Sequence, residues 1–170
     1  ITIGIKPLDA TLAEAREYVE RGFTALKVKG GHSLGGDIER LRALRRTFGG
    51  AIAVRVDPNQ GYTLRETAAF FEQTADLDIE FLEQPVKAAA AAELRALPED
   101  MRRRIALDES LLTVKDAFAL AAPPAACGIF NIKLMKCGGI SPARRLAELA
   151  EATGIALMWG CMDESRVAIA

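Results

Sequence analysis

The chain has 170 residues, which is enough for one domain with a sizeable core. Half of the residues are hydrophobic, yet no apolar run reaches the ~18 residues that a membrane span needs. The formal net charge of −1 leaves no electrostatic case for nucleic acid or an anionic membrane as a partner. The stretch "ITIGIKPLDA" lacks the features of a secretory signal. Because the three cysteines form no CxxC pair, we expect reduced thiols in a cytoplasmic protein.

Seven short β-rich runs alternate with helical patterns along the chain. The runs cover residues 2–5, 25–29, 52–57, 79–83, 105–109, 130–134 and 155–160. The helical patterns cover residues 11–22, 35–50, 63–77, 88–100, 113–123 and 141–154, the last with Ser141 as its expected N-cap. This alternation predicts an α/β fold with parallel strands, of the TIM-type (β/α) barrel class. A dinucleotide-binding fold is disfavoured because no GxGxxG turn follows the first strand.

Polar residues recur where the predicted strands end. Lys29, Asp57, Glu83, Asp108 and Lys133 are separated by 28, 26, 25 and 25 residues. Within the strands, polar and apolar residues alternate, so the polar set shares one face. The active sites of barrels form at the carboxyl ends of their strands. The sequence therefore predicts one polar site at that end of the barrel.

Three carboxylates from successive strands would repel one another in one pocket. A hard divalent cation, Mg²⁺ or Mn²⁺, would resolve the repulsion at Asp57, Glu83 and Asp108. The alternative is that each carboxylate forms an ordinary ion pair with a nearby lysine or with Arg55. Because the three are in phase on successive strands, we favour the metal.

Two lysines flank these strands in the sequence. Lys29 and Lys133 would stand on opposite sides of the pocket, with Lys27 on the same strand face as Lys29. A crowded lysine has a lowered pKa, which suits a general base. One lysine could remove the α-proton of a metal-bound carboxylate substrate, and the other could return a proton on the opposite face. The expected outcome is inversion at carbon. Lys136 has the opposite parity, and we expect a rim or structural lysine there.

Five motifs resemble the enolase superfamily, muconate-lactonizing-enzyme subgroup, in order along essentially the whole chain. They are "LKVKGG", "VDPNQGYT", "FLEQP", "LDES" and "NIKLMKCGGI". The resemblance implies Mg²⁺ held by the three carboxylates and a metal-stabilised enediolate between the two lysines, with Lys27 as an electrostatic helper. It also implies substrate-side or supporting roles for Asn59 and Glu109. The only histidine, His32, lies outside the strand pattern, which argues against the mandelate-racemase branch.

The stretch "MWGCMDES" resembles the seventh strand of dipeptide epimerases. The implied enzyme is an isomerase that inverts the α-carbon of one residue in a dipeptide, and a homo-oligomer is left open. Further substrate-side candidates are Asn131, Met162 and Asp163, of which Asp163 could favour a cationic side chain. The rivals are an o-succinylbenzoate synthase or muconate-type cycloisomerase, and a non-catalytic metal-binding fragment. A phosphate-binding barrel, suggested by "KCGGISP", is disfavoured because the carboxylates would repel phosphate.

The family's capping domain and eighth strand have no counterpart in this sequence. We therefore expect residues 1–170 to form a single incomplete barrel domain, the catalytic part of a longer enzyme. The Asp-x-Asp motif that the resemblance places on the eighth strand of dipeptide epimerases is missing with it.

Overall fold

The structure is a computed structural model that describes residues 1–162, 164, 165 and 169. It divides into two compact units, Ile1–Lys87 and Ala88–Ala170. The expectation of one incomplete barrel domain over residues 1–170 stays a prediction.

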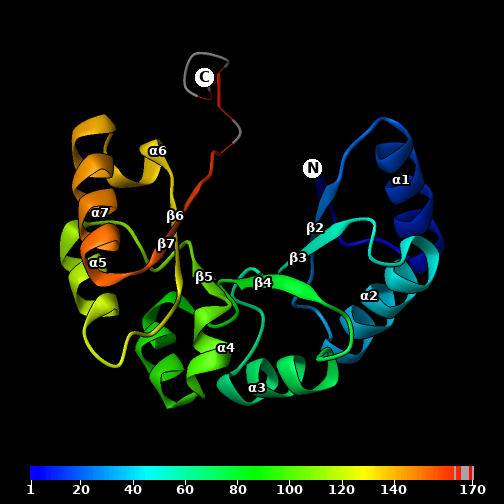
Figure 1. The fold of residues 1–170 in the computed structure, drawn as a ribbon, viewed down its shortest axis with the longest axis horizontal. Coiled ribbons are helices and arrows are strands. Elements are labelled where there is room, and N and C mark those ends of the chain that lie inside the picture. Colours follow the sequence, from blue (N-terminus) through cyan, green and yellow to red (C-terminus); the bar gives the residue numbers. More distant parts are fainter. Residues whose placement is uncertain (163, 166–168, 170) are drawn as a thin grey trace. The chain divides into compact units, whose positions relative to one another are not determined.

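The first unit is a parallel sheet whose strands are joined by helices (Figure 1). Its strands follow the order of the sequence, with Lys29 and Asp57 as partners at the carboxyl ends of two neighbours. This register brings polar strand ends side by side. The elements are β1 (Thr2–Ile3), α1 (Leu8–Glu20), β2 (Ala25–Lys29), α2 (Leu34–Phe48), β3 (Ala53–Asp57), α3 (Leu64–Gln73) and β4 (Ile79–Glu83).

The second unit repeats this plan with three strands. Strand β5 pairs with β6 and β6 with β7, in parallel. The elements are the 3₁₀ helix η1 (Ala88–Ala96), α4 (Glu99–Arg103), β5 (Ile105–Leu107), α5 (Val114–Ala121), β6 (Ile129–Ile132), α6 (Leu134–Cys137), α7 (Ile140–Thr153) and β7 (Ala156–Trp159).

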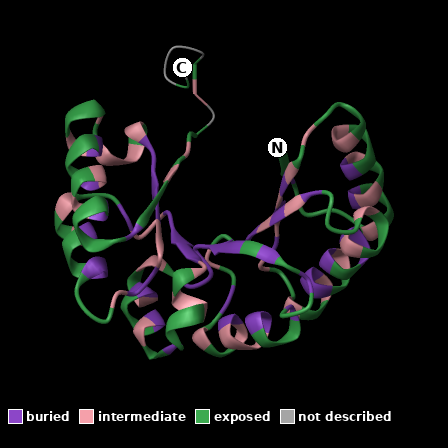
Figure 2. Ribbon diagram, in the orientation of Figure 1, coloured by how far each residue is buried: buried purple, intermediate pink, exposed green. Residues whose placement is uncertain are grey.

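Burial follows the predicted alternation in β2 and in most of β3, whereas residues 81–83 of β4 are all buried (Figure 2). In β2, Leu26 and Val28 are buried, whereas Lys27 and Lys29 are half-buried. The apolar side chains form the core and leave the polar face for the site. Parallel strands with connecting helices confirm the predicted α/β class.

Several element boundaries differ from the prediction. Helix α7 begins at Ile140 with Gly139 as its N-cap, so Ser141 lies inside the helix and is not the cap. Gly139 has a φ of 107°, a left-handed conformation that favours glycine, and the helix cap lies two residues earlier than predicted. The predicted helix over 88–100 is divided into the 3₁₀ helix η1 and the start of α4, which has Pro98 as its N-cap. Strand β5 ends at Leu107 and β6 at Ile132, which leaves Asp108 and Lys133 immediately after their strands.

None of the helices among the described residues is long and apolar enough to cross a membrane. The three cysteines are free, and burial raises the pKa of the Cys127 thiol to about 12.

Candidate active site

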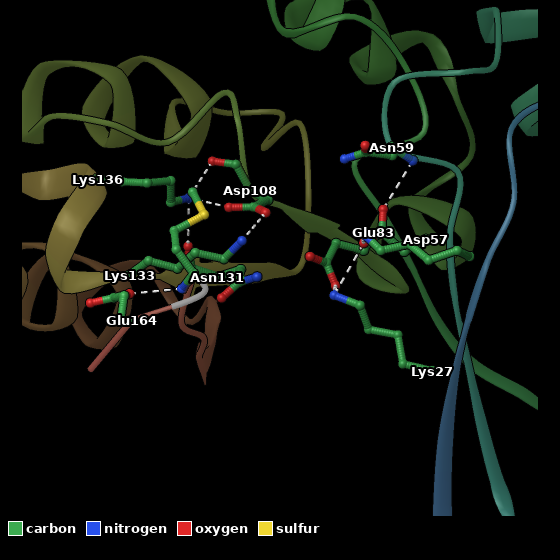
Figure 3. A network of polar contacts seen from close by, with 11 residues as sticks. Lys27, Asp57, Asn59, Glu83, Asp108, Asn131, Lys133, Lys136 and Glu164 are labelled. Carbon is green, nitrogen blue, oxygen red and sulfur yellow. Dashed lines mark hydrogen bonds and ion pairs between the residues drawn. The ribbon is translucent and has the colours of Figure 1, made fainter. Parts of the chain in front are cut away.

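The first unit gathers two lysines and two carboxylates where β2, β3 and β4 end. Lys29 Nζ lies 2.7 Å from Asp57 Oδ2, and Lys27 Nζ lies 3.1 Å from the same oxygen. Lys27 Nζ also lies 2.7 Å from Glu83 Oε2, as Figure 3 shows. The structure therefore brings together all four site residues predicted for these strands.

Both carboxylates of this cluster are withdrawn from water. Asp57 is 1% exposed and Glu83 is fully buried, and ammonium groups of nearby lysines lie against both carboxylates. Burial of Lys27 opposes its charge, but Glu83 and Asp57 outweigh burial and raise the pKa of Lys27 above its usual value. Lys27 is consequently a fixed positive charge between two carboxylates, which fits the helper role expected for it.

A tight loop after β3 orients Asp57. The backbone N–H of Asn59 donates to Asp57 Oδ1 at 2.9 Å. Asn59 and Gln60 have φ values of 50° and 69°, a left-handed turn that folds the loop back over the strand end. The backbone N–H of Gln60 donates to the carbonyl of Gln84 at 2.8 Å, which fastens this loop to β4. Asn59 therefore contacts the site through its backbone N–H, and the supporting or substrate-side role expected for it stays a prediction.

A buried acid that the sequence reasoning missed holds the loops in place. Asp37, on α2, is 3% exposed and accepts hydrogen bonds from the Gly31 backbone at 2.8 Å and from Tyr62 Oη at 2.6 Å. It also forms an ion pair with Arg40. Gly31 follows Lys29, and Tyr62 ends the loop after Asp57. Asp37 therefore ties together the loops that carry two site residues.

Lys29 faces open space on this side of the unit. It borders a pocket of about 380 Å³, and its side chain is 34% exposed. A lysine beside a cavity can reach a molecule bound there. The other lining residues are Ile5, Gly30, Gly31, His32, Pro58, Asn59 and Gly61.

The second unit gathers two lysines around one carboxylate. Lys133 Nζ lies 2.5 Å from Asp108 Oδ2. Lys136 Nζ forms an ion pair with Asp108 Oδ1 and donates to the backbone carbonyls of Asp108, at 2.5 Å, and Asn131, at 3.1 Å. Figure 3 shows both lysines directed at Asp108.

Of the rim or structural roles expected for Lys136, the structure shows the structural one, although parity had placed Lys136 on the opposite face from Lys133. The side chain of Lys136 is 6% exposed and joins the end of β5 to β6. The parity argument failed because β6 ends at Ile132 and α6 then turns the chain back, which carries Lys136 to Asp108. The three-residue spacing of Lys133 and Lys136 across a turn from strand to helix is the sequence signal that could have predicted this contact.

Charge within this cluster shifts two pKa values. Burial alone would raise the pKa of Asp108, but hydrogen bonds from Lys133 and Lys136 outweigh burial and lower it. Burial lowers the pKa of Lys136, and this effect exceeds the opposing pull of Asp108. Asp108 is accordingly held as a carboxylate.

Of the remaining predicted residues, the structure describes Asn131, Glu109 and Met162, all in the second unit. Asn131 is 1% exposed, and Glu109 is half-buried directly after Asp108. Met162 is 38% exposed and its backbone N–H donates to Glu164 Oε1 at 2.7 Å. Asp163 lies outside the described residues.

The donor atoms fit a hard divalent cation, because all three predicted ligands are buried carboxylates at strand ends. Asp57 and Glu83 belong to the first unit and Asp108 to the second. Within the described part of the chain, no group of three His, Cys, Asp or Glu side chains is arranged to hold a metal ion.

Comparison with known proteins decides the family. A family model described as enolase C-terminal domain-like matches residues 10–170. The chain belongs to this family. The enolase-superfamily resemblance and the predicted (β/α) barrel class are thereby confirmed.

Relatives of this enolase-family chain are dipeptide epimerases. It is 61% identical over 170 residues to the L-Lys-D/L-Arg epimerase of Methylococcus capsulatus, covering all of this chain and 48% of that protein. It is 36% identical over 171 residues to the L-Ala-D/L-Glu epimerase of Bacillus subtilis, covering 99% of this chain and 46% of that one.

A solved structure agrees with the sequence relatives. The dipeptide epimerase of Methylococcus capsulatus, complexed with Mg and the dipeptide L-Arg-D-Lys, superposes with a TM-score of 0.96 at 61% identity. The match covers 99% of this chain and 48% of that one. The chain spans about half the length of the curated relatives it matches.

Proposed function

We propose that this chain supplies the acid–base lysines and the metal-binding carboxylates of an Mg²⁺-dependent dipeptide epimerase. The observation that carries the proposal is that each unit pairs a lysine with a buried carboxylate where a strand ends: Lys29 with Asp57, and Lys133 with Asp108. Relatives of this chain are named epimerases, which supports the same activity.

Lys29 and Lys133 would act as the two proton-transferring groups. In one direction, the neutral amine of one lysine accepts the α-proton of the substrate, and the ammonium of the other donates a proton to the opposite face. The two lysines exchange protonation states, and the α-carbon is inverted. Bound Mg²⁺, held by Asp57, Glu83 and Asp108, would polarise the substrate carboxylate and stabilise the charge that develops when the proton leaves.

The other polar residues keep these groups charged and in place. Lys27 neutralises Asp57 and Glu83 from one side, and Lys136 neutralises Asp108. When Lys133 leaves Asp108 to meet a substrate, Lys136 still compensates that buried carboxylate. This matters because an unpaired buried charge is costly.

The proposed substrate is a dipeptide with cationic side chains. The relative with 61% identity is named for Lys and Arg, and its solved complex holds L-Arg-D-Lys. We further propose that Asp163 contacts the cationic side chain of the substrate.

The test is proton NMR of the full-length protein with Mg²⁺ and L,L-dipeptides in D₂O. The expected result is exchange and inversion at one α-carbon, faster for Lys- and Arg-containing dipeptides than for Glu-containing ones. Equal or faster turnover of Glu-containing dipeptides would contradict the cationic specificity. Elimination products without inversion would favour the synthase or cycloisomerase alternative, and Mg²⁺ binding without any exchange would favour a non-catalytic protein.

A further inference from the structure

Gly160 lies against Lys133 in the second unit, directly after β7. An ideal Cβ on Gly160 would stand 3.0 Å from Lys133 Cε and 3.2 Å from Asn131 Cγ, and it would overlap Asn131 Oδ1. The space that a side chain would take at position 160 is therefore already filled by the ends of two site side chains.

The backbone at position 160 does not itself require glycine. The glycines with left-handed φ values among the described residues are Gly22, Gly31, Gly49, Gly138, Gly139 and Gly154. Gly160 is not among them, so an alanine could adopt its conformation. Position 160 favours glycine because Asn131 and Lys133 occupy the space that a side chain would need.

Neither side of this contact can easily move away. The backbone N–H of Gly160 donates to the Ile132 carbonyl at 2.9 Å, which continues the β6–β7 pairing and fixes the glycine beside β6. Asn131 is 1% exposed and Lys133 is 8% exposed. Lys133 is also held by its 2.5 Å contact with Asp108. An added methyl group would therefore displace the Lys133 side chain or be relieved only by moving Asn131.

We infer that Gly160 is a positioning residue for Lys133: its missing side chain leaves the path along which Lys133 reaches the substrate. This inference rests on the proposed function, in which Lys133 serves one epimer and Lys29 the other. A side chain at position 160 should therefore slow the proton transfer that uses Lys133 and leave the transfer that uses Lys29 unchanged. The reason is that Gly160 contacts the side chain of Lys133 and lies in a different unit from Lys29.

The experiment measures α-proton exchange in D₂O from each of the two epimers of one dipeptide, with the full-length protein and Mg²⁺. The variants Lys29→Ala and Lys133→Ala first identify which epimer depends on which lysine. Gly160→Ala should then slow exchange from the Lys133-dependent epimer by roughly tenfold to a hundredfold in kcat, since a 1 Å misplacement can cost about a hundredfold. Exchange from the Lys29-dependent epimer and both KM values should change little.

Gly35→Ala is the matched control. A Cβ on Gly35 meets nothing within 4 Å, and its φ is not left-handed, so the added methyl should leave both exchange rates unchanged. Circular dichroism checks that each variant folds.

A double-mutant cycle with Asn131→Gly tests the cause and stays informative if the single variant folds poorly. Removing the Asn131 side chain gives the new methyl room, so Gly160→Ala should cost much less in the Asn131→Gly background. The same cost in both backgrounds, equal losses for both epimers, or no loss would overturn the inference. If the unmodified protein exchanges no α-proton with any dipeptide, the proposed function fails and this inference fails with it.

Discussion

Both units place lysines against buried carboxylates where strands end, but the numbers of lysines and carboxylates differ. In the first unit, two lysines meet two buried carboxylates, and Lys27 bridges Asp57 and Glu83. In the second unit, two lysines meet one carboxylate, Asp108. The first cluster therefore has as many lysines as carboxylates, whereas in the second two lysines share Asp108.

The comparison separates two kinds of lysine. Lys27 and Lys136 each bond to more than one acceptor, which fixes them in place. Among the described residues, Lys29 and Lys133 each contact a single carboxylate. A lysine with one partner can leave it for a substrate, so the proton transfer that we propose falls to Lys29 and Lys133, whereas Lys27 and Lys136 are anchored.

The largest effect expected is on catalysis by the proton-transferring lysines. Lys133→Ala and Lys29→Ala should each reduce epimerisation by about 10²–10⁴-fold, because each removes one acid–base group. Each single variant should keep α-proton exchange from one epimer, measured by NMR in D₂O. Exchange from both epimers in the Lys29→Ala, Lys133→Ala double variant would rule out the two-base mechanism.

The next effect tests the anchored lysine of the second unit. Lys136→Met should lower the free energy of unfolding by about 2–3 kcal/mol, because buried Asp108 and two backbone carbonyls lose a charged donor. Urea denaturation of the metal-free protein measures this change. Lys115→Met, at an exposed position of α5 in the same unit, is the control and should change stability little.

A smaller effect is expected at the loop anchor of the first unit. Tyr62→Phe removes the hydroxyl that donates to Asp37 and should cost about 1–2 kcal/mol. Faster amide hydrogen exchange should appear in the loops around Gly31 and Asn59. Tyr18→Phe, whose hydroxyl meets Glu14 on α1 at 3.1 Å, is the control, and a matching loss of loop protection there would contradict a specific role for Tyr62.

The smallest effects are opposite pH dependences in the two units of the metal-free protein. The pKa of Asp108 is lowered on folding, so its contribution to stability is present above the unfolded pKa of ~3.9 and is lost as pH falls through the folded pKa. The pKa of Lys27 is raised, so its contribution is present below ~10.4 and is lost as pH rises through the folded pKa.

Denaturation series at several pH values would measure both slopes. Asp108→Asn should flatten the acid side of the stability curve, and Lys27→Met should flatten the alkaline side. If each substitution altered the opposite side of the curve, the assignment of these shifts to the two clusters would be wrong.

Sequence reasoning predicted some residues of the site and missed others. Strand periodicity predicted Lys27 and Lys29 on one face, in a strand whose bounds, Ala25–Lys29, match the structure. For Lys136 it left a rim position open beside a structural one, because two-residue alternation has no meaning once α6 begins. Asp37 was unpredicted because a single acid on an amphipathic helix looks like an ordinary exposed residue until its partners, 25 residues away in the case of Tyr62, are known.

By itself, the sequence determined the α/β class, the positions of the strands and the residue types at their carboxyl ends. These features depend on local periodicity and spacing, which short-range sterics and burial impose on any such chain. Only the tertiary structure decided which lysine is anchored, which acid holds the loops, and why position 160 is a glycine. Those answers depend on contacts between residues distant in the sequence, and such contacts exist only once the strands are paired and the helices packed.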